Sequence, residues 1–190
     1  MVVATDVNLK SALQYAVAVL KIKHIIVCGH YDCGGIRASM KKADVGPPLE
    51  MWISHIRDVY RTHQAELDAI EDPEDRHRLM VEINAVEQCV NLFKTGVVQK
   101  MRVETAQDPE CMFPAPRIHS CVFDPKDGKL KQIDINWTEY LDERRDVYEM
   151  DGSVDELGVP LVTSPQIPDE EDPEKPKKIN LLESFFGIGE

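Results

Sequence analysis

The sequence lacks any run of the roughly 18 consecutive apolar residues that a membrane-spanning helix needs. Its N-terminus also lacks the basic start and apolar middle of a secretory signal. Basic residues are few, because 22 Lys and Arg stand against 34 Asp and Glu for a formal net charge of −12. A surface of that sign repels phosphate groups. We therefore expect a soluble chain with no membrane span and no nucleic acid partner.

A disulfide framework is also excluded by composition. The five cysteines are an odd number, irregularly spaced, in a chain of 190 residues. A chain of this length can form one hydrophobic core without disulfide bonds. We therefore expect the cysteines to be free thiols or metal ligands in a reducing compartment. We expect a cytoplasmic or mitochondrial protein.

The composition divides the chain into two parts. Residues 151–190 hold ten acidic and three basic residues, net −7, and five of the twelve prolines. Such a segment buries too little apolar surface to fold alone. We expect an α/β domain over residues 1–150 and an acidic, proline-rich extension over 151–190. Its end carries an apolar patch, which either docks on a surface or remains in a solvated tail: Leu181, Leu182, Phe185, Phe186 and Ile188.

Helical and strand patterns alternate along the first 150 residues. We expect a first helix capped by Asn8, a strand at 23–28, helices at 34–42, 50–69, 73–94 and 95–102, a loop at 102–116, and a hairpin of strands 118–123 and 129–135. The apolar run at 23–28 does not alternate, which is typical of a parallel strand buried on both faces. The pattern predicts an α/β fold with a mainly parallel sheet flanked by helices and a C-terminal antiparallel hairpin strand.

The turn after the predicted buried strand, GHYDCGG at residues 29–35, is the strongest candidate site. Open α/β sheets bind ligands beyond the carboxyl ends of their strands. His30 and Cys33 supply an imidazole and a thiol, and the helix that follows favours a thiolate. This donor pair suits Zn²⁺, so we assign both residues as candidate metal ligands.

Three glycines, Gly29, Gly34 and Gly35, flank these ligands, and we expect them to shape the site by letting the backbone turn sharply. They do not indicate a nucleotide site. Neither the P-loop pattern with its lysine nor a G-x-G-x-x-G pattern is present.

Four segments carry a resemblance to the β-class carbonic anhydrases: residues 11–37, 52–66, 84–99 and 118–130. The resemblance implies zinc bound by His30 and Cys33, with a third ligand from a cysteine on an earlier strand and water or an aspartate in the fourth position. It implies reversible hydration of carbon dioxide to bicarbonate by zinc-activated hydroxide, and association into dimers or multiples of dimers.

The chain departs from the family in its first residues. The family's Cys-x-Asp-x-Arg segment has no counterpart before the matched residues. One zinc thiolate and an Asp/Arg pair are therefore missing, so no residue receives a catalytic role. Two strands that would flank residues 23–28 are missing as well, which predicts a bare sheet edge that invites another chain.

Two functions remain open. The first is a β-carbonic anhydrase whose third zinc ligand comes from sequence not present here. The second is a truncated or degenerate family member without activity, a pseudoenzyme retained as a structural or regulatory subunit of a larger assembly.

Other candidate donors are expected to be structural. Asp32 should face solvent or a basic neighbour, and Cys28 should not act as a ligand. His119 and Cys121 share one strand face, where a hydrogen-bonded histidine and a small core residue are favoured over a metal pair. The remaining histidines are expected at the surface or satisfied in the core: His24, His55, His63 and His77.

Overall fold

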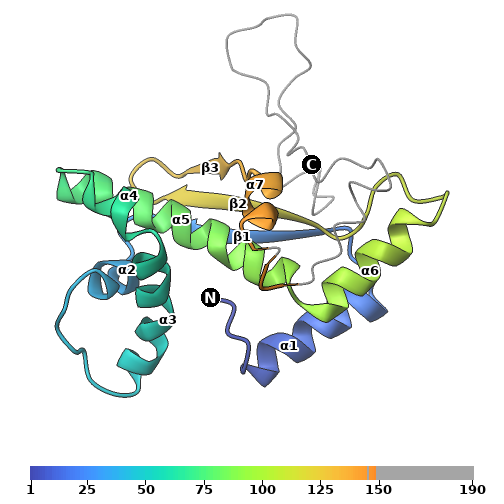
Figure 1. Ribbon diagram of the computed structural model, residues 1–190, viewed down its shortest axis with the longest axis horizontal. Helices are drawn as coiled ribbons and strands as arrows, with labels where there is room; N and C mark the ends of the chain where they lie inside the picture. Colours follow the sequence, from blue (N-terminus) through green and yellow to red (C-terminus); the bar gives the residue numbers. More distant parts are fainter. Residues whose placement is uncertain (145, 149–190) are drawn as a thin grey trace, which may run out of the picture.

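The computed structural model describes residues 1–144 and 146–148 of the chain. Its helices and strands follow one another as shown in Figure 1. The helices are α1 (Val7–Gln14), the π-helix η1 (Tyr15–Val19), α2 (Gly34–Ser39), α3 (Leu49–Thr62), α4 (Gln64–Asp68), α5 (Pro73–Phe93), α6 (Gly96–Ala106) and α7 (Trp137–Asp142). The strands are β1 (His24–His30), β2 (Arg117–Asp124) and β3 (Lys129–Ile133). The extension at 151–190, with its apolar end, lies outside the described residues.

The described strands form one mixed sheet in the order β1-β2-β3. β1 and β2 are parallel, with a register from His24 opposite Arg117 to His30 opposite Phe123. β3 returns antiparallel to β2 through the predicted hairpin turn. The α/β fold with a parallel pair and an antiparallel hairpin strand is confirmed.

The long helix α5 covers one face of this sheet (Figure 1). Asp72 caps it, because its carboxylate accepts hydrogen bonds from the backbone N–H groups of Glu74 and Asp75, and Pro73 occupies the first turn. A methyl group added at Gly29 of β1 would lie 3.6 Å from side-chain atoms of Val81 and Ala85. β1 thus packs close to α5 along a shared apolar face.

The opposite face of the sheet is open in the described part of the chain. Ile26 of β1 is 42% exposed, Phe123 of β2 38% and Leu130 of β3 51%. The expectation that β1 is buried on both faces is therefore wrong, because α5 covers only the face that carries Ile25, Val27 and Gly29. In the described sheet β1 pairs only with β2, so its other side is an unpaired sheet edge. The sequence predicts this edge.

Several helix boundaries differ from the sequence-based expectations. Asp6, not Asn8, caps α1. The helix expected at 50–69 is interrupted at His63, whose φ of −104° and ψ of 20° leave the helical region. The first helix passes into the π-helical turn η1, and Leu20 at its end is 58% exposed.

The segment expected as a loop from residue 102 begins as helix, since α6 continues to Ala106. Arg102 lies on this helix and is buried, with Nη1 donating hydrogen bonds to the carbonyl oxygens of Pro114 and Pro116. The guanidinium thereby ties the end of the loop to α6. No helix in the described residues combines the length and apolarity that a membrane crossing requires.

Candidate metal centre

The predicted zinc ligands lie at the carboxyl end of β1 and the start of α2. His30 is the last residue of β1 and is exposed on the open face of the sheet. Cys33 is half-buried and occupies the N-cap position of α2, without a side-chain capping hydrogen bond. A helix start is a favourable environment for an anion such as thiolate.

Tyr31 anchors the turn between the two ligands. Its backbone N–H donates to the carbonyl of Phe123 at 2.9 Å, which extends the β1–β2 ladder by one residue. Its buried side chain donates a short hydrogen bond to Glu82, and the guanidinium of Arg78 lies 3.6 Å from the ring centroid. Burial and the Glu82 carboxylate raise the pKa of Tyr31 to about 12, so the phenol remains a donor.

His77 of α5 holds the backbone of Cys33. Its ring is 2% exposed, and Nε2 donates to the carbonyl oxygen of Cys33 at 3.2 Å. In the neutral imidazole this leaves Nδ1 as the unprotonated nitrogen. The sequence interpretation of His77 as surface or core-satisfying missed this contact with the site.

Asp32 faces basic neighbours, as expected. Its carboxylate lies 3.6 Å from Arg37 and 3.9 Å from Lys126. Arg37 also makes two hydrogen bonds, of 2.7 and 3.0 Å, to the carboxylate of Glu74. These cations neutralise the only group of three donor side chains that the described residues bring together, Asp32, Glu74 and His77.

The sharp bend of the turn falls at Asp32, whose φ is +56°. Gly29, Gly34 and Gly35 are not among the residues with positive φ. Gly34 has open space around the position of a Cβ atom. At Gly35 a Cβ atom would approach the Trp52 ring to 3.1 Å, so Gly35 matters for the packing of α2 on α3.

The other thiols and imidazoles have structural surroundings. The exposed Cys28 donates to the carbonyl of Gly29 at 3.4 Å. His119 is hydrogen-bonded to His24 on the neighbouring strand, with 3.0 Å between Nε2 of His119 and Nδ1 of His24. Cys121 is buried. Both residues have the structural surroundings that the sequence predicts. Cys89 is also buried, which raises the pKa of its thiol to about 12. All five cysteines are free.

Comparison with known proteins decides the family. The family model described as "Carbonic anhydrase" matches residues 1–130. A carbonic anhydrase of Emericella nidulans is 42% identical over 145 residues, which cover 76% of this chain and 60% of that protein. The chain belongs to the β-carbonic anhydrase family.

Solved structures of β-carbonic anhydrases share the fold. CafA of Aspergillus fumigatus superposes with a TM-score of 0.64 at 26% identity, covering 80% of this chain and 68% of that chain. A tetrameric β-carbonic anhydrase of Sordaria macrospora gives a TM-score of 0.63 at 29% identity, covering 71% and 64%. The chain spans between about half and three fifths of the length of the curated carbonic anhydrases that it matches first, 60% for Emericella nidulans and 47% for Candida albicans.

The donor chemistry of the β-carbonic anhydrase turn fits zinc in kind but is incomplete in number. His30 and Cys33 offer the nitrogen and sulfur that Zn²⁺ prefers. A catalytic zinc generally has three protein ligands. Within the described residues, the one group of three candidate donors does not include His30 or Cys33.

Proposed function

We propose that the protein takes part in the reversible hydration of carbon dioxide to bicarbonate, with His30 and Cys33 as two ligands of a zinc ion. The observation that supports this proposal is the GHYDCGG turn at the end of a parallel strand, in a chain 42% identical to a carbonic anhydrase. The third protein ligand would come from sequence beyond this chain or from an associated chain.

The residues around the turn would position the ligands. Tyr31 fixes the loop through its backbone and its phenol, and His77 fixes the carbonyl of Cys33. Arg37 and Lys126 hold the carboxylate of Asp32, which keeps it from competing as a ligand. Zinc supplies the Lewis acidity that makes hydroxide available from water near neutral pH.

The missing third donor favours a second candidate function. A family member that holds zinc weakly or not at all would act as a structural or regulatory subunit in an oligomer. The open face and bare edge of the sheet offer a surface for such association.

Zinc analysis and a carbon dioxide hydration assay on the purified 190-residue protein separate the two candidates. Catalysis predicts close to one zinc per chain and a rate above buffer, with both lost in His30→Ala and Cys33→Ser. Cys111→Ser is the matched control, because this loop thiol is remote in sequence from the turn, and it should retain zinc and rate. Zinc well below one per chain together with a rate equal to buffer would overturn the enzymatic proposal and support the subunit.

A further inference from the structure

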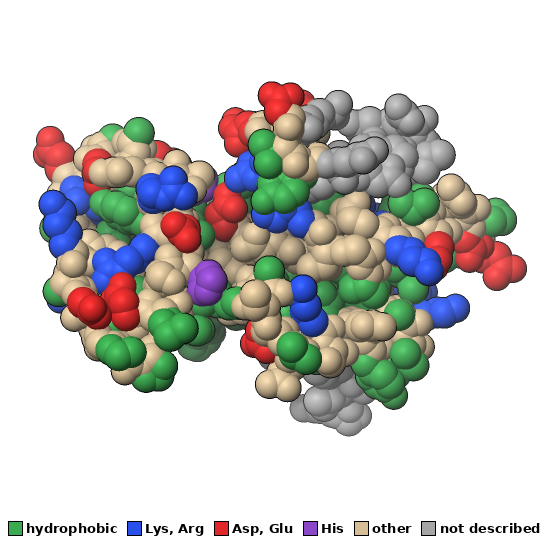
Figure 2. All heavy atoms as spheres, turned by 60° about the horizontal axis from the view of Figure 1, so that its bottom comes forward, with side chains coloured by type: hydrophobic (Ala, Val, Ile, Leu, Met, Phe, Trp, Pro, Cys, Tyr) green, Lys and Arg blue, Asp and Glu red, His purple; other side chains and the backbone are tan. Residues whose placement is uncertain are grey.

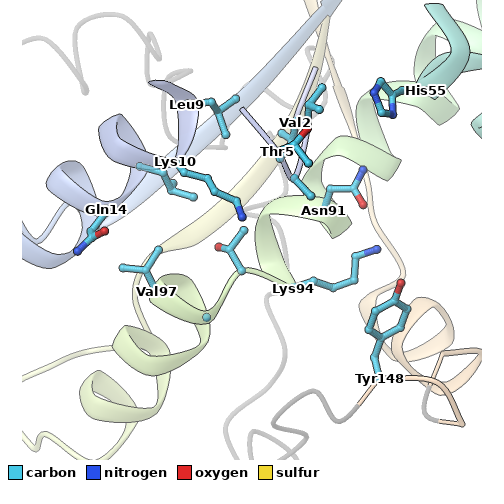
Figure 3. A pocket seen from close by; sticks show the side chains of 15 residues that line it. Val2, Thr5, Leu9, Lys10, Gln14, His55, Asn91, Lys94, Val97 and Tyr148 are labelled. Carbon is cyan, nitrogen blue, oxygen red and sulfur yellow. The ribbon is translucent and has the colours of Figure 1, made fainter. Parts of the chain in front are cut away.

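A cavity of about 670 Å³ lies between the first residues of the chain, α1, and the junction of α5 with α6. Figure 2 shows a face of the molecule that is hollowed between two lobes, and Figure 3 shows the side chains that line the cavity. The volume falls in the range of about 300–1,000 Å³ that small-molecule sites occupy. Neither His30 nor Cys33 lines it, so the cavity is separate from the candidate metal centre.

The charge of the cavity is opposite to that of the chain. Lys10 and Lys94 line it, and the 15 described residues that line it include no Asp or Glu. With 34 acidic residues in 190, a random set of that size would hold two or three. A cavity wall that holds two lysines without acidic side chains beside them favours an anionic ligand.

The two lysines reach the cavity from different elements. Lys10 extends from α1 toward the α5–α6 junction, and Lys94 extends toward Tyr148, with Nζ 4.8 Å from the ring centroid (Figure 3). None of the ion pairs among the described residues involves Lys10 or Lys94. Burial lowers the pKa of Lys94, although the Glu87 carboxylate opposes that shift. Glu87 itself is engaged by His63 and Arg144.

The first turn of α6 adds backbone donors to the same wall. Thr95, Gly96 and Val97 line the cavity, and the N-cap Thr95 makes no side-chain capping bond because its hydroxyl donates to the carbonyl of Leu92. The backbone N–H groups at the start of this 11-residue helix are therefore available to an anion.

The remaining wall is largely apolar, with Val2, Leu9, Leu13 and Val97 among the lining residues. An inorganic anion would leave this surface unused, whereas a hydrocarbon group would bury it. We propose that the cavity binds a small organic carboxylate, whose charge pairs with Lys10 and Lys94 and whose apolar body packs against these side chains.

The probe for this site is 4-fluorobenzoate, followed by ¹⁹F NMR in titrations with the full 190-residue chain. We expect saturable binding that is about tenfold weaker in Lys94→Gln and in Lys10→Gln, since each variant removes a charged donor. Lys100→Gln, on the exposed surface of α6, is the matched control and should bind as the unaltered chain does. Lys10 is exposed, so its variant carries the test even if Lys94→Gln fails to fold.

Two further comparisons test the ligand class and the location. Neutral 4-fluorobenzamide and inorganic phosphate should each bind at least tenfold more weakly than 4-fluorobenzoate. Gly96 lines the cavity, and a Cβ atom there meets nothing within 4 Å, so Gly96→Leu adds a bulky side chain to this wall and should weaken binding. The proposal is overturned by absence of saturable binding, by equal affinity for benzamide or phosphate, or by unchanged affinity in Lys10→Gln and Gly96→Leu.

Discussion

His77 donates a 3.2 Å hydrogen bond from Nε2 to the backbone carbonyl of Cys33, a residue 44 positions earlier in the chain. The contact joins the first turns of α5 to the start of α2. It fixes the backbone of a proposed zinc ligand without using the ligand's side chain. A buried ring in this position supports both the fold and the geometry of the turn.

Replacing His77 separates these two effects. We expect His77→Ala to lower the free energy of unfolding by about 2 kcal/mol, through a cavity and an unpaired carbonyl. Zinc affinity should fall about tenfold, as for other groups that orient metal ligands. Urea unfolding and chelator competition measure the two quantities. His77→Gln retains a donor and should recover part of the zinc affinity; equal zinc affinity in all three proteins would contradict a positioning role.

Asp32 adopts a left-handed backbone conformation, with φ of +56°, that glycine adopts without steric cost. Asp32→Gly and Asp32→Ala both remove the exposed ion pair with Arg37. The difference in stability between the two variants therefore reports the cost of the left-handed backbone conformation alone. We expect the glycine variant to be more stable than the alanine variant by about 1 kcal/mol. Thermal or urea unfolding checks the difference, and an alanine variant of equal or greater stability would show that the turn relaxes at little cost.

The pair of the half-buried His63 and the buried Glu87 makes stability depend on pH. The hydrogen bond to Glu87 raises the pKa of His63 above its usual 6.5, although burial opposes it. Burial opposes the shift at Glu87 too, but the His63 hydrogen bond and the Arg144 charge lower its pKa below the usual 4.5. The His63 contribution is complete below pH 6.5 and is lost as the pH rises through the folded-state pKa. The Glu87 contribution is complete above pH 4.5 and is lost in acid.

Urea unfolding between pH 5 and pH 9 tests this assignment. The unaltered chain should lose stability as the pH rises from 6.5 through the raised pKa of His63, and His63→Gln should flatten that part of the profile. His55→Gln serves as control, because His55 is exposed on α3. A His63→Gln profile parallel to that of the unaltered chain would assign the loss to other groups.

The sheet was predictable because its signals are local. An apolar run defines β1, and two short runs around residues 124–128 define the hairpin. The break at His63 was not predictable in this way, because it accompanies a contact with Glu87, 24 residues later. The exposure of Ile26 depends on which elements cover the sheet, and a continuous apolar run does not contain that information.

The candidate site likewise has some residues with a local sequence signal and others that are placed by contacts between distant segments. His30 and Cys33 stand out through their spacing and their resemblance to a family. The contact of His77 was not predictable because it depends on how α5 crosses the sheet. Its one sequence signal is an imidazole in the second turn of a long helix. The sequence analysis predicts that the glycines bend the turn, whereas the left-handed residue is Asp32, because aspartate also tolerates this conformation.

Arg102 makes the attachment of the segment before β2 insensitive to pH. Burial lowers the pKa of this guanidinium to about 10, which still lies far above neutrality. Its two hydrogen bonds to the carbonyl oxygens of Pro114 and Pro116 therefore do not depend on pH near neutrality. The segment that leads into β2 is therefore held by a guanidinium that stays charged. The α3–α4 junction, in contrast, loses the stabilising charge of His63 when that imidazole is deprotonated.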